Sequence, residues 1–401
     1  MNDVLGSASA PAPDAAAQEE LFVGGPAQEL QQRLGLAAPG EHRVGRRILL
    51  FVLLAWVPLL PLTAAQGHLW LPRGGESLLT DYGAWARYLV AAPLLLGGEA
   101  VAGGVLSRVA ERIAWLLPAS GPERLRFTQM AASLLRLRAS PYPALVLAAL
   151  AWLLSAAVIT GAPPSRLPAW HRSAIDPALL SPAGWWVAFV SLPLFLLLVL
   201  IWVWRLLLWT RFLWQAAGLR LRLIPVHPDR AGGIGFVAQS LRGFAPVAAA
   251  AGAVVAGAVG NAVVHSGATF ADMKFLIAGT VLANVALFTA PLLVFSMKLW
   301  HAWIRGSREY DQLAHALGRQ FESQWFPSAS ALGPEVMERS DFSAACDLYG
   351  VVDRAHDMRW FPVDVPGMVA LAIATLLPFV PVVLLALPLD LVLGTLADLL
   401  R

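Results

Sequence analysis

Residues 185–209 read WWVAFVSLPLFLLLVLIWVWRLLLW, with Arg205 as the one charged residue and tryptophan at both ends. An apolar run of about 18 or more residues is long enough to cross a hydrocarbon layer roughly 30 Å thick. Because lipid offers no partner for backbone N–H and C=O groups, such a run must satisfy them internally as a helix. Tryptophans at the ends are typical of the membrane interface. The stretch therefore predicts a transmembrane helix.

The composition extends this prediction to the whole chain. Apolar residues make up 58% of the sequence and charged residues 14%, which lies outside the range of soluble domains. The alternating ten-residue segments of a membrane β-barrel are absent from the sequence. We therefore predict an all-α fold, a polytopic α-helical membrane protein with about seven transmembrane helices and a cytoplasmic helical hairpin.

Other counts exclude several classes of partner and site. The net charge of +3 is too small to indicate a nucleic-acid partner. The single cysteine, Cys346, excludes an intrachain disulfide and a metal site built from several cysteines. We expect no cofactor.

Seven apolar runs are spaced along the chain. They cover Ile48–Gln66, Ala86–Leu106, Tyr142–Gly161, Trp185–Trp209, Phe244–Val264, Phe275–Met297 and Pro366–Ala386. The fifth run consists almost entirely of small residues, which let helix backbones approach closely, so we expect it to be buried among its neighbours. The connector 107–140 contains two stretches, 109–117 and 123–138, whose apolar and basic faces predict helices on the membrane surface.

Four segments follow from this pattern. Residues 1–40 are rich in Ala, Pro, Gln and Glu and predict a disordered cytoplasmic tail. Residues 41–297 form a membrane domain with six spans, and the polar insert 298–365 predicts a cytoplasmic helical hairpin. Residues 366–401 are too long for one straight crossing, so we expect a last span followed by an amphipathic C-terminal helix. An eighth crossing in this block stays an alternative.

The basic residues predict the orientation. With the N-terminus in the cytoplasm, most of the 29 lysines and arginines fall on the cytoplasmic side of this plan. This asymmetry follows the positive-inside rule.

One polar, glycine-rich stretch interrupts the apolar sequence, PVHPDRAGGIGF at residues 225–236, hereafter the central loop. Glycines let backbone N–H groups approach an anion, and nearby arginines can add charge, which favours a site for an anion, a phosphate or a lipid headgroup. The other interpretation is a tight turn in which the aspartate caps a helix and the glycines allow close packing. The candidate residues are His227, Asp229, Arg230, Gly232, Gly233 and Gly235, with Arg220, Arg222 and Arg242 as further cations.

The central loop and the spans around it resemble a motif in a group of uncharacterised bacterial polytopic inner-membrane proteins. The stretch MRWFPVD at residues 358–364 resembles the second short signature of that group. The resemblance covers the chain from about the fourth span to the C-terminus. It implies a multi-pass protein of the bacterial inner membrane and no known activity.

Glu99 is the candidate residue within a span. A carboxylate there costs roughly 2.5–3.5 kcal/mol on insertion scales, so it faces a cavity, pairs with a cation or is protonated. One interpretation is a proton or ion pathway with Asn261 or Asn284 as companions. The other is a residue near the inner end of its span that reaches water or pairs with an arginine such as Arg108.

The remaining polar residues give weaker indications. Asp311 and His315 lie four residues apart in the insert, and Asp353, His356 and Asp357 lie within one turn. These types can bind metals, but such spacings are usual on solvated helix faces, so we predict no metal site. Residues 265 and 272 are expected in a solvent-exposed loop. The sequence contains no recognisable nucleophile and base, and we predict no catalytic residues.

Together these features favour a non-enzymatic scaffold or sensor that acts through the central loop and the hairpin. Its partners are the lipid bilayer and either a cytoplasmic protein or anionic lipid headgroups. The first alternative is a proton- or ion-coupled transporter or channel that uses Glu99. The second is a membrane-bound enzyme that acts on lipid or phosphate substrates.

Overall fold

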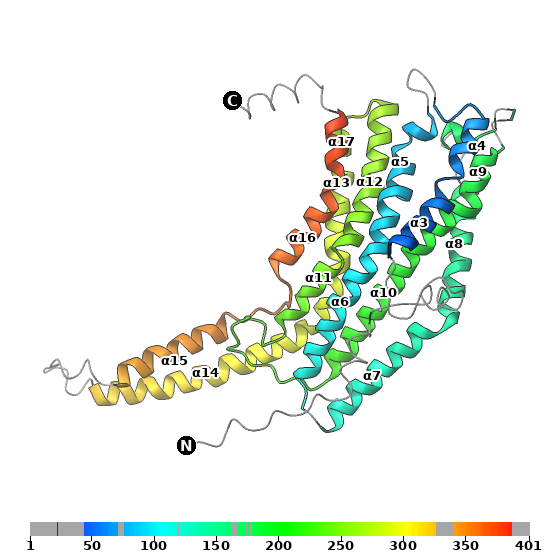
Figure 1. Ribbon diagram of the computed structural model, residues 1–401. Coiled ribbons are helices and arrows are strands. Elements are labelled where there is room, and N and C mark those ends of the chain that lie inside the picture. Colours follow the sequence, from blue (N-terminus) through cyan, green and yellow to red (C-terminus); the bar gives the residue numbers. More distant parts are fainter. Residues whose placement is uncertain are drawn as a thin grey trace.

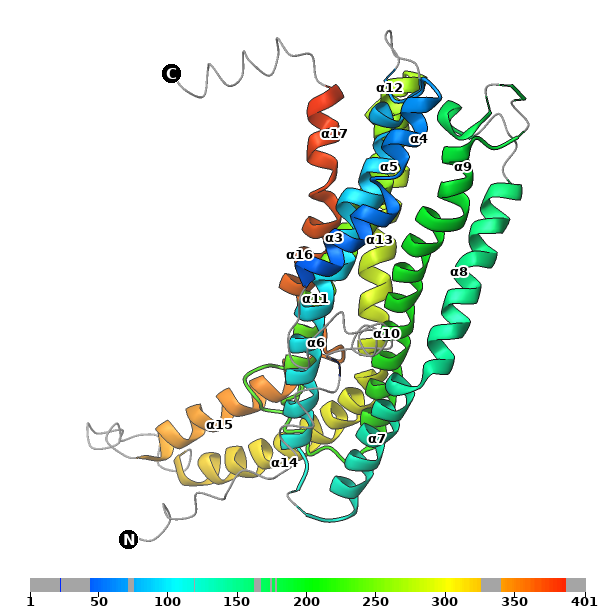
Figure 2. The same cartoon turned by 45° about the vertical axis from the view of Figure 1, so that its right-hand side comes forward.

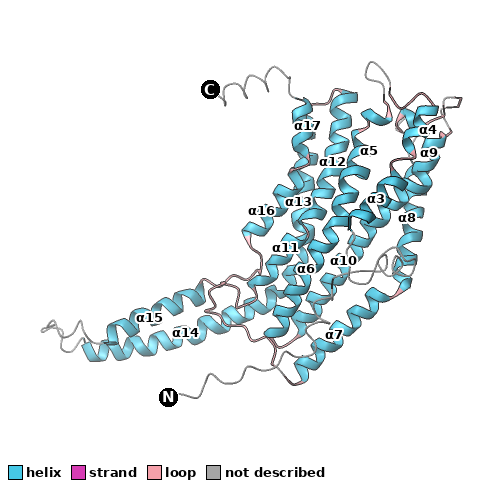
Figure 3. Cartoon of the chain, in the orientation of Figure 1, coloured by secondary structure: helices cyan, strands magenta, loops and turns pink. Residues whose placement is uncertain are grey.

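The computed structural model describes residue 22 and residues 44–70, 76–118, 120–161, 167–173, 175–176, 179–325 and 340–386. Within these ranges the chain is mostly helical, and its β-structure is one isolated bridge between Arg172 and Leu180 (Figure 3). Six helical stretches are long and apolar enough to cross a membrane, and a seventh is present if one bent pair of helices counts as a single span. The predicted all-α polytopic fold is confirmed.

The helices follow the chain in an almost unbroken series. The first half contains α3 (Val44–Ala55), α4 (Leu59–Ala65), η1 (Leu78–Thr80), α5 (Tyr82–Trp85), η2 (Ala86–Ala91), α6 (Ala92–Trp115), α7 (Pro122–Ala139), α8 (Pro141–Gly161), η4 (Ala169–His171), α9 (Pro182–Trp186), η5 (Val187–Ser191) and α10 (Leu192–Gly218). The second half contains η6 (Gly235–Gln239), α11 (Ser240–Gly243), α12 (Ala245–Ser266), α13 (Phe270–Thr289), η7 (Ala290–Phe295), α14 (Ser296–Trp325), α15 (Ser340–His356), α16 (Val365–Leu376) and α17 (Phe379–Ala386).

The long helices form a bundle, and α14 leaves one end of it sideways (Figures 1 and 2). Helix α15 packs along α14, so the two make an arm that projects from the bundle. We call this pair the hairpin arm, the end of the bundle that bears it the hairpin end, and the other the far end. The two helices predicted in the polar insert are thus present, and the first continues out of the sixth span.

Pro58 breaks the first span at a site where side chains of the fourth span take over the lost hydrogen bonds. Pro58 separates α3 from α4, because proline has no N–H to donate to the carbonyl four residues earlier. The carbonyl of Leu54 instead accepts from Trp186 Nε1 at 3.0 Å, and the carbonyl of Ala55 accepts from Ser191 Oγ at 2.7 Å. These two hydrogen bonds therefore connect the first span to the fourth at the break.

The second and fourth spans each contain a π-helical turn, η2 or η5, which follows the short helix α5 or α9. Each π-turn lies directly before a helix with proline near its first residue, Pro93 or Pro193. A π-turn widens the helix, which accommodates a proline that lacks its N–H. In η5 the carbonyl of Ala188 accepts from Ser155 Oγ of α8 at 2.7 Å. The bond ties the peripheral helix α8 to the bundle.

Helix α12 packs closely against its neighbours, as its small residues predict. Half of the residues in its most apolar stretch are buried, a larger share than in any other of the six spans. A Cβ on Gly252 would lie 2.0 Å from the carbonyl oxygen of Thr375 in α16, and a Cβ on Gly257 would lie 2.7 Å from the carbonyl oxygen of Tyr82. Only glycine allows these two backbone contacts.

At the hairpin end, the structure differs from the prediction in one helix and adds one contact of the N-terminal tail. Residues 109–115 do not form a separate surface helix; they continue α6, because Val109 and Ile113 are fully buried in the core of the bundle. In the expected tail, Phe22 is buried against Trp209 and Phe212, with ring centroids 5.2 and 5.6 Å away. The other residues of the tail, and the expected C-terminal helix beyond residue 386, lie outside the described residues.

Candidate functional site

The central loop is organised by the carboxylate of Asp229. Its Oδ1 accepts from the N–H groups of Ala231 at 2.9 Å and Gly233 at 3.0 Å, and its Oδ2 accepts from Gly235 at 2.9 Å. His227 Nδ1 lies 2.8 Å from Oδ1. The glycine-rich backbone thus forms a nest for an anion, but the anion is the protein's own carboxylate.

The backbone conformation explains the residue types. Arg230, Gly232 and Gly233 have φ values of +55°, +64° and +93°, in the region where side chains other than glycine are strained. These turns fold the chain back over Asp229 and aim three N–H groups at it. The tight-turn interpretation of the loop therefore describes its geometry, with Asp229 as an acceptor inside the loop.

The same hydrogen bonds set the charge state of Asp229. Burial by itself raises the pKa of a carboxyl group, but the three backbone N–H donors and His227 outweigh it. The pKa of Asp229 therefore lies below its ordinary value, and the loop contains a fixed negative charge at neutral pH.

The loop is joined to the base of the hairpin arm. The N–H of Arg359 donates to the carbonyl of Arg230 at 2.7 Å, and the guanidinium of Arg230 lies 3.7 Å from the carboxylate of Asp357. A Cβ on Gly306 of α14 would lie 2.5 Å from Pro225, so the loop also touches the other helix of the arm. The central loop, α14 and the end of α15 thus form one joint.

The two stretches on which the resemblance rests therefore meet in space. A Cβ on Gly232 would lie 3.0 Å from the Cε of Met358, and Arg359 donates to the loop carbonyl. The next residue, Trp360, packs its ring against Trp300 and Trp303 of α14, with centroids 4.5 and 5.7 Å away. The second stretch thus connects the loop to an aromatic cluster at the base of the arm.

A cavity of about 490 Å³ lies between the loop, the end of α6 and the start of α16. The charged side chains in its wall are Arg112, Arg242, Asp229 and Asp364, and His227 joins them. Asp229 is occupied by the loop, and Asp364 caps α16 by accepting from Gly367 at 3.2 Å. The cavity has room for an anionic group beside the loop, and Arg112 and Arg242 can bind it.

The arginines that line this cavity differ in part from those that the sequence predicted around the loop. Of the arginines expected around the loop, Arg242 lines the cavity, whereas Arg230 points to the arm. Arg112, which the sequence did not single out, supplies the second cation; its guanidinium lies 4.3 Å from the ring centroid of Phe236 and donates to Gln239 at 3.2 Å. An arginine in the last turn of a long helix gives no sequence signal for a contact with a loop over a hundred residues later.

Glu99 is held between two arginines. Arg47 of α3 donates to Oε2, and Arg205 of α10 lies 3.1 Å from Oε1. All three side chains are largely buried, and Trp202 covers Arg205 with its ring 5.2 Å away. The arginine-paired interpretation describes Glu99, with these partners instead of Arg108.

The two asparagines do not join Glu99. Asn284 donates to Thr375 Oγ1 at 3.2 Å, between α13 and α16. Asn261, at the far end of α12, donates to Asp81 Oδ1 at 2.8 Å and accepts from the N–H of Tyr82 at 2.8 Å. The structure therefore places the three predicted intramembrane polar residues at three separate sites.

Asp81 anchors a polar network at the far end that sequence reasoning missed. Besides Asn261, it accepts from the N–H of Ala84 at 3.0 Å and from Trp170 Nε1 at 3.2 Å. One carboxylate thus fixes α5, α12 and the connector between the third and fourth spans. Neighbouring His171 is 5% exposed, and both its ring nitrogens are buried without a hydrogen bond. Burial lowers the pKa of His171 to about 4, although Asp81 opposes the shift.

In the hairpin arm, one residue from each of the two polar groups noted in the sequence meets the other. His356 Nε2 lies 2.9 Å from Asp311 Oδ1 across the two helices. Within the part of the chain that the structure describes, no group of three or more His, Cys, Asp or Glu side chains is arranged to hold a metal ion. Cys346 is exposed on α15.

Comparison with known proteins adds no assignment to this geometry. No family model, curated protein or solved structure matches the chain. The function must therefore be argued from the site itself.

Proposed function

We propose that the protein is a non-enzymatic scaffold or sensor of the bacterial inner membrane, which engages a cytoplasmic protein through the central loop and the hairpin arm. The observation that supports this proposal is the joint between them. The carboxylate of Asp229 is occupied by the loop's own N–H groups, and Arg230 contacts the arm by backbone and side chain. Such a loop suits a mechanical connection better than a substrate site.

The arm has the shape and surface for a partner. Helix α14 is 30 residues long, which corresponds to about 45 Å at 1.5 Å per residue, and most of it lies outside the bundle (Figure 1). Leu313 on α14 and Tyr349 on α15 are 52% and 50% exposed. Exposed aromatic and aliphatic side chains on a rigid arm are the usual anchors of protein interfaces.

Site-specific photocrosslinking in native membranes tests the proposal. A photoreactive amino acid in place of Leu313 or Tyr349 is expected to capture one discrete protein. The matched control position is Leu125 of α7, which is also exposed at the hairpin end but lies off the arm and outside the loop cavity. Asp229→Ala, which loosens the joint, is expected to weaken the crosslink from both arm positions.

Reconstitution in liposomes tests the transport alternative. Proton or ion flux that disappears with Glu99→Gln, together with no specific crosslink from the arm, would refute the scaffold proposal. One observation supports the scaffold over this alternative: Glu99 pairs with two arginines and does not line the loop cavity.

A further inference from the structure

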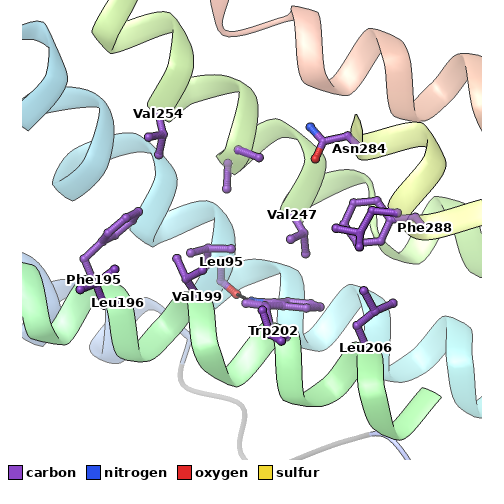
Figure 4. A pocket seen from close by; sticks show the side chains of 14 residues that line it. Leu95, Phe195, Leu196, Val199, Trp202, Leu206, Val247, Val254, Asn284 and Phe288 are labelled. Atoms are coloured by element: carbon purple, nitrogen blue, oxygen red, sulfur yellow. Dashed lines mark hydrogen bonds between the residues drawn. The ribbon is translucent and has the colours of Figure 1, made fainter. Parts of the chain in front are cut away.

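A second cavity, of about 400 Å³, lies inside the membrane-spanning part of the bundle, away from the loop and the arm (Figure 4). It is bounded by α6, α10, α12 and α13. Its lining residues are almost all apolar: Leu95, Phe195, Leu196, Val199, Trp202, Val203, Leu206, Val247, Ala250, Ala251, Val254, Asn284, Leu287 and Phe288.

The cavity exists because two spans diverge over a helix of small residues. Helices α10 and α13 both pack against η7 but make few contacts with each other. Beneath the gap between them, α12 presents Ala250 and Ala251, which are too small to fill it. Phe195, Trp202 and Phe288 form the larger walls (Figure 4). The sequence of α12 thus leaves space on one face while its glycines pack tightly on another.

The cavity opens sideways. Val203 of α10 and Leu287 of α13 both line it, and they are 47% and 52% exposed on the surface of the bundle. Both helices belong to stretches apolar enough to cross a membrane. The opening between them therefore faces the hydrocarbon layer.

The walls offer little to a charged ligand, because the lining contains no charged side chain and few polar atoms. Trp202 Nε1 already donates to the carbonyl of Leu95 at 3.0 Å, and the Asn284 amide donates to Thr375 at 3.2 Å. A charged or strongly polar group would lose its hydration there without gaining a partner. The volume lies in the range of roughly 300–1,000 Å³ typical of ligand pockets, and a helix about 10 Å across would not fit.

We propose that this cavity binds one acyl chain of a membrane phospholipid, which enters between α10 and α13 and leaves its headgroup outside. Leaving bilayer hydrocarbon for an apolar wall gains no hydrophobic free energy, so the affinity comes from van der Waals contact with the aromatic walls. The bound chain completes the packing of α12 in the gap that its alanines leave. This inference does not depend on the proposed function.

Photolabelling tests the site. The protein is reconstituted in vesicles that contain a phospholipid with a photoreactive group in the middle of one acyl chain, and labelled residues are mapped by mass spectrometry. We expect labelling of the α12 segment 247–254 to exceed that of the lipid-exposed face of α8, represented by Leu145 and Leu153.

Variants that fill the cavity provide the control. Ala251→Phe places a ring in the cavity and is expected to lower labelling of the segment several-fold, whereas Ala286→Phe, on the exposed face of α13 that points away from the cavity, leaves it unchanged. If Ala251→Phe does not fold, Val247→Trp makes the same test. Labelling of the segment no greater than that of α8, or unchanged in the folded cavity-filling variant, would overturn the proposal.

Discussion

Replacing Asp229 with alanine removes one acceptor that three backbone N–H groups share. The N–H of Ala231 belongs to a buried residue, and a buried donor without a partner costs about 1–3 kcal/mol. Gly233 and Gly235 are only half-buried, so water replaces part of what their N–H groups lose. We therefore expect the loop to be destabilised by roughly 3 kcal/mol relative to its open state.

Hydrogen exchange read by mass spectrometry measures this change locally. At about 1.4 kcal/mol for each factor of ten, exchange of the amides in residues 225–236 should speed up roughly a hundredfold. Asp229→Asn keeps an oxygen on one side and is expected to show a smaller increase. Asp347→Ala, at an exposed position of α15, is the matched control and should leave the loop unchanged.

Acid should produce the same loosening without a mutation. Because hydrogen bonds hold the pKa of Asp229 below its ordinary value of 3.8, the unfolded loop binds the proton more readily than the folded one. The contribution of Asp229 to the stability of the folded loop is fully present at pH values above 3.8. It is lost as the pH falls through the lower pKa of Asp229 in the folded loop. The reasoning fails if Asp229→Ala leaves exchange in residues 225–236 unchanged, or if it speeds exchange equally throughout α12.

Three further substitutions test other parts of the structure by thermal unfolding in detergent. Glu99→Gln leaves two largely buried arginines without their anion and should destabilise the protein by roughly 3 kcal/mol; an unchanged Tm would contradict the buried ion pairing. Gly252→Ala forces a Cβ against the carbonyl of Thr375 and should lower the Tm, whereas Gly279→Ala, with nothing within 4 Å, should not. His171 binds a proton less readily folded than unfolded, so stability should fall as the pH drops from 6.5 to about 4, and His171→Gln should flatten that fall.

Much of the fold follows from the residues alone. The apolar runs identify the spans because lipid forces every such run into a helix, whatever its neighbours are. The small residues of the fifth run likewise indicated that it would be buried. The boundaries were less accurate: α6 extends to Trp115 because burial by neighbouring helices outweighs the amphipathic pattern of its last turns.

The candidate site was found in sequence but not understood from it. The glycines around Asp229 suggested either an anion site or a tight turn, and both patterns need the same residues. Whether the nest is filled by an outside anion or by its own carboxylate depends on backbone torsions, which composition does not reveal. The contact of the loop with Met358 and Arg359 joins residues more than a hundred positions apart, and one sequence carries no signal for it.

The sequence by itself determined that this chain is a bundle of membrane helices with a polar loop and a helical arm, because hydrophobic length and helical periodicity are local properties. Tertiary structure alone decided which polar groups meet. Glu99 pairs with Arg47 and Arg205, and Asn261 pairs with Asp81, because buried polar groups take the partners that helix packing brings within reach. Packing is set by the shapes of several helices at once, so no single stretch of sequence contains it.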